Sequence, residues 1–267
     1  MGGDVDIVTV DASNVDRYGF FCYKSKPKTA GYQQKRAWLE ERFAEGLRIK
    51  IVREGGKPAG FIEYAPGEFA WRVVNAPNYL VVHCMWVVGR GKGKGYGSRL
   101  LDESIADAQL LGKQGVAMVT SRRPWLAGSG LFLRHGFEPT GAASPSFELL
   151  VRSFGDAPLP NFPSDWDRRL GQYGHGLTVV RSGQCPYLDN GAQAALAAAS
   201  EMGVPAQVVE LATAQQVQHS APSAYGVFGI VYDGKLLTYL PIGRKGIVEL
   251  LQQLTGCSPA IGQLTGD

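Results

Sequence analysis

Four glycines alternate with other residues in a short basic stretch that could bind phosphate. They are Gly91, Gly93, Gly95 and Gly97, and the cations Arg90, Lys92, Lys94 and Arg99 lie among or beside them. The first N–H groups of a helix lack intrahelical partners and carry partial positive charge, and glycines let a phosphate approach such amides closely. Because an apolar run precedes the glycines and helical spacing follows them, we expect a diphosphate-binding loop; the alternative is a solvated basic loop.

Two other phosphate-binding loops fit this stretch poorly. A Walker loop needs Gly-Lys-Ser/Thr after its second glycine, whereas residues 95–100 read GYGSRL. A dinucleotide fingerprint needs an early strand and an acidic residue that closes the next strand. Here several strands come first, and the strand expected at 115–120 ends in Thr120 and Ser121.

The surrounding pattern predicts an α/β segment that positions the loop. Strands are expected at 6–10, 79–88, 115–120 and 146–154, a hairpin at 47–65 that turns at Gly55-Gly56, and helices at 31–46, from Gly97 to Leu111 and at 130–135. The nearly continuous apolar run at 79–88 is typical of a central strand buried on both faces.

A second α/β segment follows a change in composition. Residues 155–176 contain three prolines and no periodicity, which predicts a linker across the surface, with Trp166 as a possible anchor. A strand, a helix and a strand are then expected up to residue 212, followed by a hairpin that turns at Asp233-Gly234 and a last helix at 246–254. We predict domains at 1–154 and 177–267.

Two motifs of the first domain resemble those of the GNAT superfamily of N-acetyltransferases. Residues 92–97 (KGKGYG) match Gln/Arg-x-x-Gly-x-Gly/Ala with lysine in the first place, and residues 131–137 (LFLRHGF) are similar to the family's FYEKxGF segment. The element order of residues 5–153 agrees. The resemblance implies an α/β (α+β) fold with a mixed, splayed central sheet and flanking helices. It also implies direct acyl transfer from acetyl-CoA to an amine of a small-molecule or peptide acceptor.

The resemblance also implies the residues that bind coenzyme A. Pantetheine would pair with the splayed strand like an added strand, and loop amides would hold the diphosphate. A backbone N–H near Trp86 or Val87 would polarise the thioester carbonyl. The cofactor-binding residues expected on this basis are Met85, Val87, Val88, Lys92, Gly93, Lys94, Gly95, Tyr96, Gly97, Ser98 and Phe132.

The acid and base of the reaction are not fixed by the resemblance. Phe132 stands where the family often has a tyrosine that protonates the leaving thiolate, and phenylalanine cannot do this. The other candidates are His83, Cys84, Glu63 and Ser121, unless water serves or the thiolate leaves unprotonated. Strand alternation places His83 with Met85 on one face and Cys84 with Trp86 on the other. Trp86 is a candidate for lining an acceptor pocket, although each of these side chains also suits a core.

The second domain resembles a thioredoxin-like fold. Residues Cys185-Pro186-Tyr187 are similar to the Cys-Pro-Tyr-Cys of glutaredoxins, with Leu188 in place of the second cysteine, and Pro222 stands where such proteins have a cis-proline. The whole chain is similar to bacterial GNAT proteins with a C-terminal YoaP-like domain. A helix N-terminus lowers a thiol pKa, so the alternative function is a thiol- or redox-responsive CoA-binding protein that uses Cys185.

Composition limits the remaining classes. The chain has 267 residues, 45% hydrophobic and 19% charged, with a net charge of +3, so we expect a globular protein without a nucleic-acid partner. The N-terminus does not read as a secretory signal and no long apolar run predicts a membrane span, so a cytoplasmic location is expected. The four cysteines (Cys22, Cys84, Cys185 and Cys257) show no paired spacing, and no disulfide framework or metal site is expected. The oligomeric state stays open.

Overall fold

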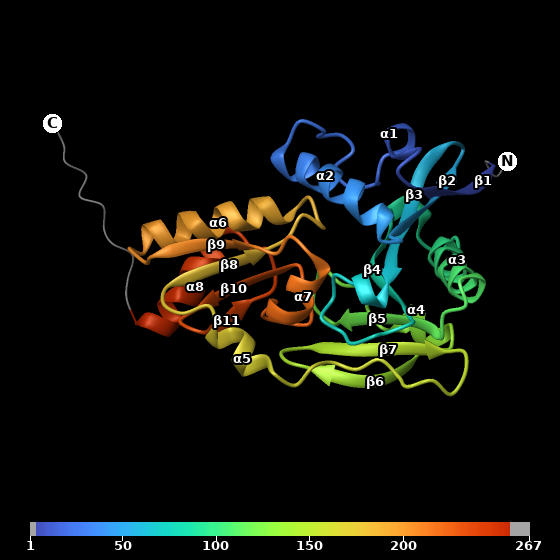
Figure 1. Cartoon of the computed structure of the whole chain (residues 1–267). Coiled ribbons are helices and arrows are strands. Elements are labelled where there is room, and N and C mark those ends of the chain that lie inside the picture. Colours follow the sequence, from blue (N-terminus) through green and yellow to red (C-terminus); the bar gives the residue numbers. More distant parts are fainter. Residues whose placement is uncertain (1–3, 257–267) are drawn as a thin grey trace.

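The computed structural model describes residues 4–256 and contains two β-sheets (Figure 1). The strands of one lie between Val5 and Ser153 and those of the other between Leu177 and Thr238, and we call these two parts of the chain the first half and the second half. The larger sheet has seven strands in the order β1-β2-β3-β4-β5-β7-β6. They are β1 (Val5–Val10), β2 (Arg48–Glu54), β3 (Lys57–Pro66), β4 (Leu80–Val87), β5 (Gly115–Ser121), β6 (Glu138–Ala143) and β7 (Phe147–Ser153). Neighbouring strands are antiparallel except for the parallel pair β4 and β5. The predicted mixed sheet is confirmed.

Helices cover both faces of the larger sheet. The α-helices are α1 (Val15–Tyr18), α2 (Ala30–Ala44), α3 (Tyr96–Leu110) and α4 (Gly130–Arg134), and two short 3-10 helices, η1 (Gly67–Phe69) and η2 (Gly89–Gly91), lie in loops. On one face Trp38 of α2 packs in a core with Phe61 of β3. On the other face Leu100 of α3 and Phe132 of α4 pack in a core with Ile62 of β3. We call the first of these the α2 face and the second the α3 face.

The parallel strands β4 and β5 separate along their length. They pair from Leu80 opposite Val116 to Val82 opposite Met118. Beyond that point, no pairing joins them within residues 4–256, although β4 continues to Val87 and β5 to Ser121. We call this divergence the splay. Because β4 stays paired with β3 as far as Val87, only the β4 edge that faces β5 is released.

The smaller sheet has four strands in the order β11-β10-β8-β9. They are β8 (Leu177–Arg181), β9 (Ala206–Glu210), β10 (Phe228–Tyr232) and β11 (Lys235–Thr238), and the helices around them are α5 (Trp166–Gly171), α6 (Leu188–Glu201), α7 (Ala214–Ser220) and α8 (Arg244–Thr255). Strands β8 and β9 are parallel and joined by α6, whereas β10 is antiparallel to both β8 and β11. The β8-α6-β9 unit followed by a hairpin and a helix confirms the predicted element order.

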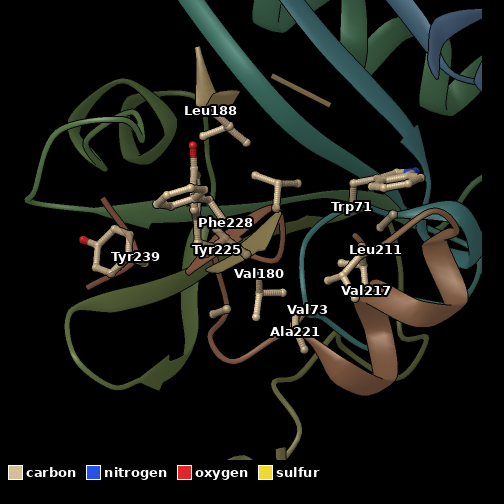
Figure 2. Packing of buried hydrophobic residues seen from close by; sticks show 14 of the residues in the cluster. Trp71, Val73, Val180, Leu188, Leu211, Val217, Ala221, Tyr225, Phe228 and Tyr239 are labelled. Atoms are coloured by element: carbon tan, nitrogen blue, oxygen red, sulfur yellow. The ribbon is translucent and has the colours of Figure 1, made fainter. Parts of the chain in front are cut away.

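The loop between β3 and β4, residues 67–79, docks into the second half of the chain. Figure 2 shows Trp71 and Val73 of this loop among buried side chains of the second half, including Val217 and Tyr225. The side-chain amide of Gln218 donates hydrogen bonds of 2.8 and 2.6 Å to carbonyls of the same loop. One continuous hydrophobic core therefore runs through both halves.

Most predicted elements are present, with ends shifted by a few residues. The structure adds α1, β6, α5 and α7, which we did not predict. Helix α5 lies within the segment predicted as an irregular linker, and its Trp166 packs partly buried against the core. The expectation that 79–88 is buried on both faces is wrong at its end, because Trp86 is 57% exposed. Cys257 lies outside the described residues, and within residues 4–256 no helix is long and apolar enough to cross a bilayer.

Gly226 provides a test of how the loop at 67–79 docks into the second half of the chain. Its φ is +80°, and a Cβ built on it would lie 2.7 Å from the backbone oxygen of Trp71. Gly226→Ala should therefore lower the free energy of unfolding by about 1–3 kcal/mol, because strain and a backbone clash add. Gly243→Ala is the control, since φ is ordinary there and its Cβ meets nothing within 4 Å. Equal melting temperatures for the two variants would contradict the docked arrangement.

Candidate functional site

The glycines between β4 and α3 serve two different purposes. Gly93 and Gly95 have φ angles of +77° and +76°, a conformation in which other residues are strained. Gly91 and Gly97 instead allow close packing: a Cβ on Gly91 would lie 3.0 Å from Val87, and one on Gly97 would lie 3.3 Å from Leu131 of α4. The alternating glycines thus turn the backbone and seat the first turn of α3 beside β4 and α4.

The first turn of α3 fits an anionic ligand. Its N-cap is Gly95, and among the residues that the structure describes no side chain caps the helix. The free N–H groups of the first turn and the positive end of the helix dipole are therefore available to a ligand. Because Met85 lies within 3.7 Å of a Cβ built on Gly97, this helix end lies directly beside the released part of β4. The residues present thus fit the diphosphate and pantetheine of coenzyme A.

The basic side chains of the loop already have partners. Lys94 Nζ forms a bidentate ion pair with Glu54, at 2.7 and 2.9 Å. The ammonium of Lys92 lies 5.8 Å from the ring centroid of Trp86, and Arg90 donates a hydrogen bond to the Pro58 carbonyl. The role predicted for Lys92 and Lys94 stays a prediction, which rests on their backbone N–H groups more than on their ammonium groups.

Three predicted cofactor residues offer little or no side-chain surface to a ligand. Tyr96 and Phe132 are buried in the core of the α3 face, where the Phe132 ring packs edge-on against Phe137. The hydroxyl of Ser98 lies 3.0 Å from Nε2 of His135, whose Nδ1 lies 3.1 Å from Asp102. This contact ties α3 to the end of α4. Met85, Val87 and Val88 are half-buried along the splay.

A β-bulge changes the faces predicted for the β4 side chains. The register with β3 shifts so that Val82 lies opposite Tyr64 and Cys84 opposite Glu63, which leaves His83 as the extra residue. His83 therefore points toward Glu63 and Trp71 on the α2 face, together with Cys84, while Met85 packs on the α3 face. The prediction that His83 and Met85 share a face is wrong, because simple alternation does not hold across a bulge.

Glu63 is the centre of a buried charge network between the two halves of the chain. Lys35 Nζ of α2 lies 2.6 Å from its Oε2, and the Gln184 amide donates to its Oε1 at 2.7 Å. Burial raises the pKa of Glu63, but the charge of Lys35 and the imidazole of His83 outweigh burial and hold the pKa at about 2. Glu63 is thus ionised and has both oxygens occupied, so it is a weak base at neutral pH.

His83 is held as a neutral imidazole. Its Nε2 accepts a hydrogen bond of 3.0 Å from the Trp71 backbone N–H, so the proton of the neutral ring is on Nδ1, which lies 3.5 Å from Glu63 Oε1. Burial lowers the pKa of His83. Since the lone pair of Nε2 is already used, His83 positions the β3–β4 loop and cannot accept a proton without losing this contact.

Three thiols gather around this network. Cys84 of β4, Cys22 of the loop after α1, and Cys185 before α6 are partly exposed and free. Burial raises the pKa of all three thiols, that of Cys84 to about 12. The expectation that the helix N-terminus lowers the thiol pKa of Cys185 is wrong, because desolvation outweighs the hydrogen bond from the Tyr187 backbone. Among the described residues no group of three or more His, Cys, Asp or Glu side chains is arranged to hold a metal ion.

Arg72 brings a second buried cation to the same region. It donates hydrogen bonds to the backbone oxygens of Trp71 and Tyr225 at 3.0 and 3.1 Å, and a short one to that of His83. No carboxylate among residues 4–256 pairs with it, and its Nε has no acceptor. Lys35, Arg72 and Gln184 were not predicted as site residues from the sequence. A lysine three residues before the buried Trp38 was the one available signal, since it places a cation near the apolar side of α2.

Comparison with known proteins relates the chain to acetyltransferases. The model of the Acetyltransferase (GNAT) family matches residues 17–137. The uncharacterized N-acetyltransferase YoaP of Bacillus subtilis (strain 168) is 30% identical over 251 residues, which are 92% of this chain and 98% of that protein. The chain belongs to the GNAT acetyltransferase family. It transfers an acetyl group from acetyl-CoA to an amine, as the motif at 92–97 predicted.

Other acetyltransferases match parts of the chain. The L-methionine sulfoximine/L-methionine sulfone acetyltransferase of Salmonella typhimurium is 29% identical over 86 residues, 32% of this chain and 48% of that protein. A GNAT acetyltransferase from Brucella melitensis, solved with acetyl-CoA, has a TM-score of 0.39 and 16% identity, covering 60% of this chain and 97% of its own. For yncA from Salmonella typhimurium the TM-score is 0.42 and the identity 18%, with 59% and 98% covered.

Gly97 allows a direct test of the anion site. Gly97→Glu should weaken binding of coenzyme A about tenfold or more, because a carboxylate in the first turn of α3 repels the diphosphate. Its stability should not suffer from the charge, since acidic residues favour a helix N-terminus. Gly97→Ala is the matched control for the added Cβ. Titration calorimetry that gives both variants the same Kd would contradict the site.

Glu63 should also make stability depend on pH. Its pKa is depressed in the folded state, so its ionised form stabilises the fold above the unfolded value of about 4.3 and this stabilisation is lost as pH falls toward 2. Glu63→Gln should cost about 3–5 kcal/mol at neutral pH by leaving Lys35 buried without a counter-charge. It should also remove this part of the acid dependence.

Chemical denaturation from pH 7 down to pH 2.5 measures both effects. Glu54→Gln is the control, because it breaks the exposed pair with Lys94 and should change stability little. A Glu63→Gln variant as stable as wild type at pH 7 would show that the pair is not buried as described.

Proposed function

We propose that this acetyltransferase binds a small-molecule amine on the α2 face of the splay, in a site that the second half of the chain completes. The observation that carries the proposal is the release of the β4 edge beyond Val82, beside an uncapped helix end on the α3 face. Coenzyme A can then approach from the α3 face. The α2 face is left for the acceptor, and there residues from both halves meet around Glu63.

Different groups at the splay serve different steps of acetyl transfer. The amides of Gly93–Ser98 hold the diphosphate, and the released β4 edge from Met85 to Val88 orients the pantetheine and thioester. A β4 backbone N–H at Trp86 or Val87 stabilises the negative charge that develops on the thioester oxygen. The amine nitrogen attacks the carbonyl carbon directly. The occupied oxygens of Glu63 and the high thiol pKa of Cys84 support positioning roles for them in place of base or nucleophile roles.

The charges on the α2 face support an acceptor that carries a carboxylate. Lys35 and Arg72 bring two buried cations, and Glu63 brings one anion that Lys35 already neutralises. Arg72 lacks a carboxylate partner among the described residues. A relative that matches 32% of this chain is named as an acetyltransferase of L-methionine sulfoximine and L-methionine sulfone. We therefore propose an α-amino acid or an analogue as the acceptor.

We also propose that the second half is a thioredoxin-like domain, residues 177–267. Its sheet order and the position of Cys185 before α6 support this assignment. Two features of this domain differ from those of redox-active thioredoxin-like proteins. Leu188 replaces the second cysteine, and the peptide bond before Pro222 is trans, since within residues 4–256 the cis bond precedes Pro145. Together with the raised pKa of the Cys185 thiol, these features favour a structural domain over the alternative of a redox-responsive protein.

An acceptor panel tests the proposed function. Purified protein with acetyl-CoA should release free thiol fastest with α-amino acids such as L-methionine sulfoximine and L-methionine sulfone. The amine that corresponds to L-methionine sulfone without its carboxylate, 3-(methylsulfonyl)propylamine, should be at least about tenfold slower than the sulfone in kcat/KM because Arg72 then has no anion to pair with. Faster turnover of the decarboxylated amine would contradict the proposed acceptor class.

The same assay tests Cys185. Cys185→Ser should keep kcat within about twofold, because a thiol with a raised pKa contributes no thiolate to the reaction. Pro186→Ala at the adjacent position controls for disturbance of the contact with α2, where the Pro186 carbonyl lies against Gly31. Loss of turnover in Cys185→Ser alone would revive a thiol-dependent function.

A further inference from the structure

Three hydroxyl groups form a closed ring where the second half of the chain meets the end of β5. Tyr239 Oη lies 2.9 Å from Ser121 Oγ and 3.0 Å from Ser146 Oγ, and the two serine oxygens are 3.0 Å apart. Tyr239 follows β11 and is buried, and Figure 2 shows it near Tyr225. Its ring centroid lies 4.5 Å from that of Phe147 and 5.8 Å from that of Tyr225. Each hydroxyl can donate one hydrogen bond and accept others, so the ring can pass a proton along.

The ring lies at the mouth of the splay. Ser121 is three residues beyond Met118, the last β5 residue paired with β4, and Met85 is three residues beyond Val82, the partner of Met118. The two residues are thus roughly level on opposite sides of the opening, apart from the extra residue of the bulge. Since the thioester is expected beside Met85 to Val87, the register places Ser121 across the splay from the leaving thiolate.

The other groups near the splay cannot readily protonate that thiolate. Phe132 has no hydroxyl and is buried. Glu63, with a pKa of about 2, has no proton to give at neutral pH, and Cys84 holds its proton with a pKa of about 12. The Nδ1–H of His83 faces Glu63. Thr120, the neighbour of Ser121 in β5, donates its hydroxyl proton to the Glu148 carbonyl at 3.3 Å. The ring, by contrast, joins three hydroxyl groups at the end of β5 and reaches the second half of the chain through Tyr239.

We propose that Tyr239, acting through Ser121, supplies the proton that the departing coenzyme A thiolate takes up. This step rests on the splay being the transfer site. As the acceptor nitrogen forms its bond to the carbonyl carbon, the C–S bond breaks and the sulfur takes the Ser121 proton. Ser121 takes the Tyr239 proton in the same motion. The acceptor nitrogen loses one proton to solvent. Sulfur thus gains one proton and nitrogen loses one, so the overall reaction neither consumes nor releases protons.

A solvent route restores the tyrosine. Ser146 bonds Tyr239 and also lines a cavity of about 400 Å³ with Arg122, Ser144 and Glu148. Water in this cavity can return a proton through Ser146 to the phenolate. Ser121 is therefore the group that meets the substrate, and Tyr239 is the positioning and relay residue that the second half of the chain contributes to the active site.

Steady-state kinetics of Tyr239→Phe test the proposal, with the best acceptor of the panel and with hydroxylamine as a small substitute amine. The substitution removes one oxygen and keeps the ring packing. It should lower kcat about a hundredfold, within the usual contribution of general acid catalysis. The KM for acetyl-CoA should stay within about threefold. The solvent deuterium isotope effect on kcat should also change, which a purely structural hydroxyl would not cause.

Two controls separate the role of this hydroxyl from other effects. Tyr173→Phe removes another buried hydroxyl of the second half, one that bonds the Ser220 carbonyl, and should leave kcat unchanged. Ser121→Ala should reproduce the loss seen in Tyr239→Phe, and the double variant should lose little more than either single variant. A Tyr239→Phe enzyme with wild-type kcat and isotope effect would overturn the relay while leaving the acetyltransferase assignment intact.

Discussion

The structure depends on one interruption of backbone pairing, the loss of the β4–β5 ladder after Val82 and Met118. Backbone N–H and C=O groups need partners when they are buried, so a central strand with one released edge is stable only if something else covers that edge. A ligand with its own amide groups, such as pantetheine, can do so. The bulge at His83 lies at the start of the released edge and turns two adjacent side chains, His83 and Cys84, to the α2 face.

The second half of the chain then explains why the α2 face can hold buried charge. Glu63 would be costly to bury beside Phe61 without partners, and its partners come from α2 and from the Gln184 side chain of the other half. Arg72 has the corresponding role for the loop at 67–79, since its guanidinium joins backbone oxygens of both halves. The polar contacts and the shared core act together, so the two halves pack as one unit around Glu63.

Local patterns allowed much of the fold to be predicted from sequence. Apolar runs and glycine turns placed β2 to β5, α2, α3 and the second sheet, and the motif at 92–97 indicated the family. What failed was non-local. A bulge depends on the register with a neighbouring strand, so alternation could not place His83, and the thiol pKa of Cys185 depends on burial by a distant segment. Helices α5 and α7 are too short for a periodic signal.

Candidate site residues divided along the same line. The glycines and the β4 stretch could be named because each lies in one continuous motif, whereas Lys35, Arg72, Gln184 and Tyr239 reach the candidate site only after folding.

The most direct test of the account is a crystal structure of the protein with coenzyme A. It should show the diphosphate against the amides of residues 93–98 and the pantetheine along the β4 edge from Met85 to Val88. Density for the cofactor at any other surface would contradict the central claim.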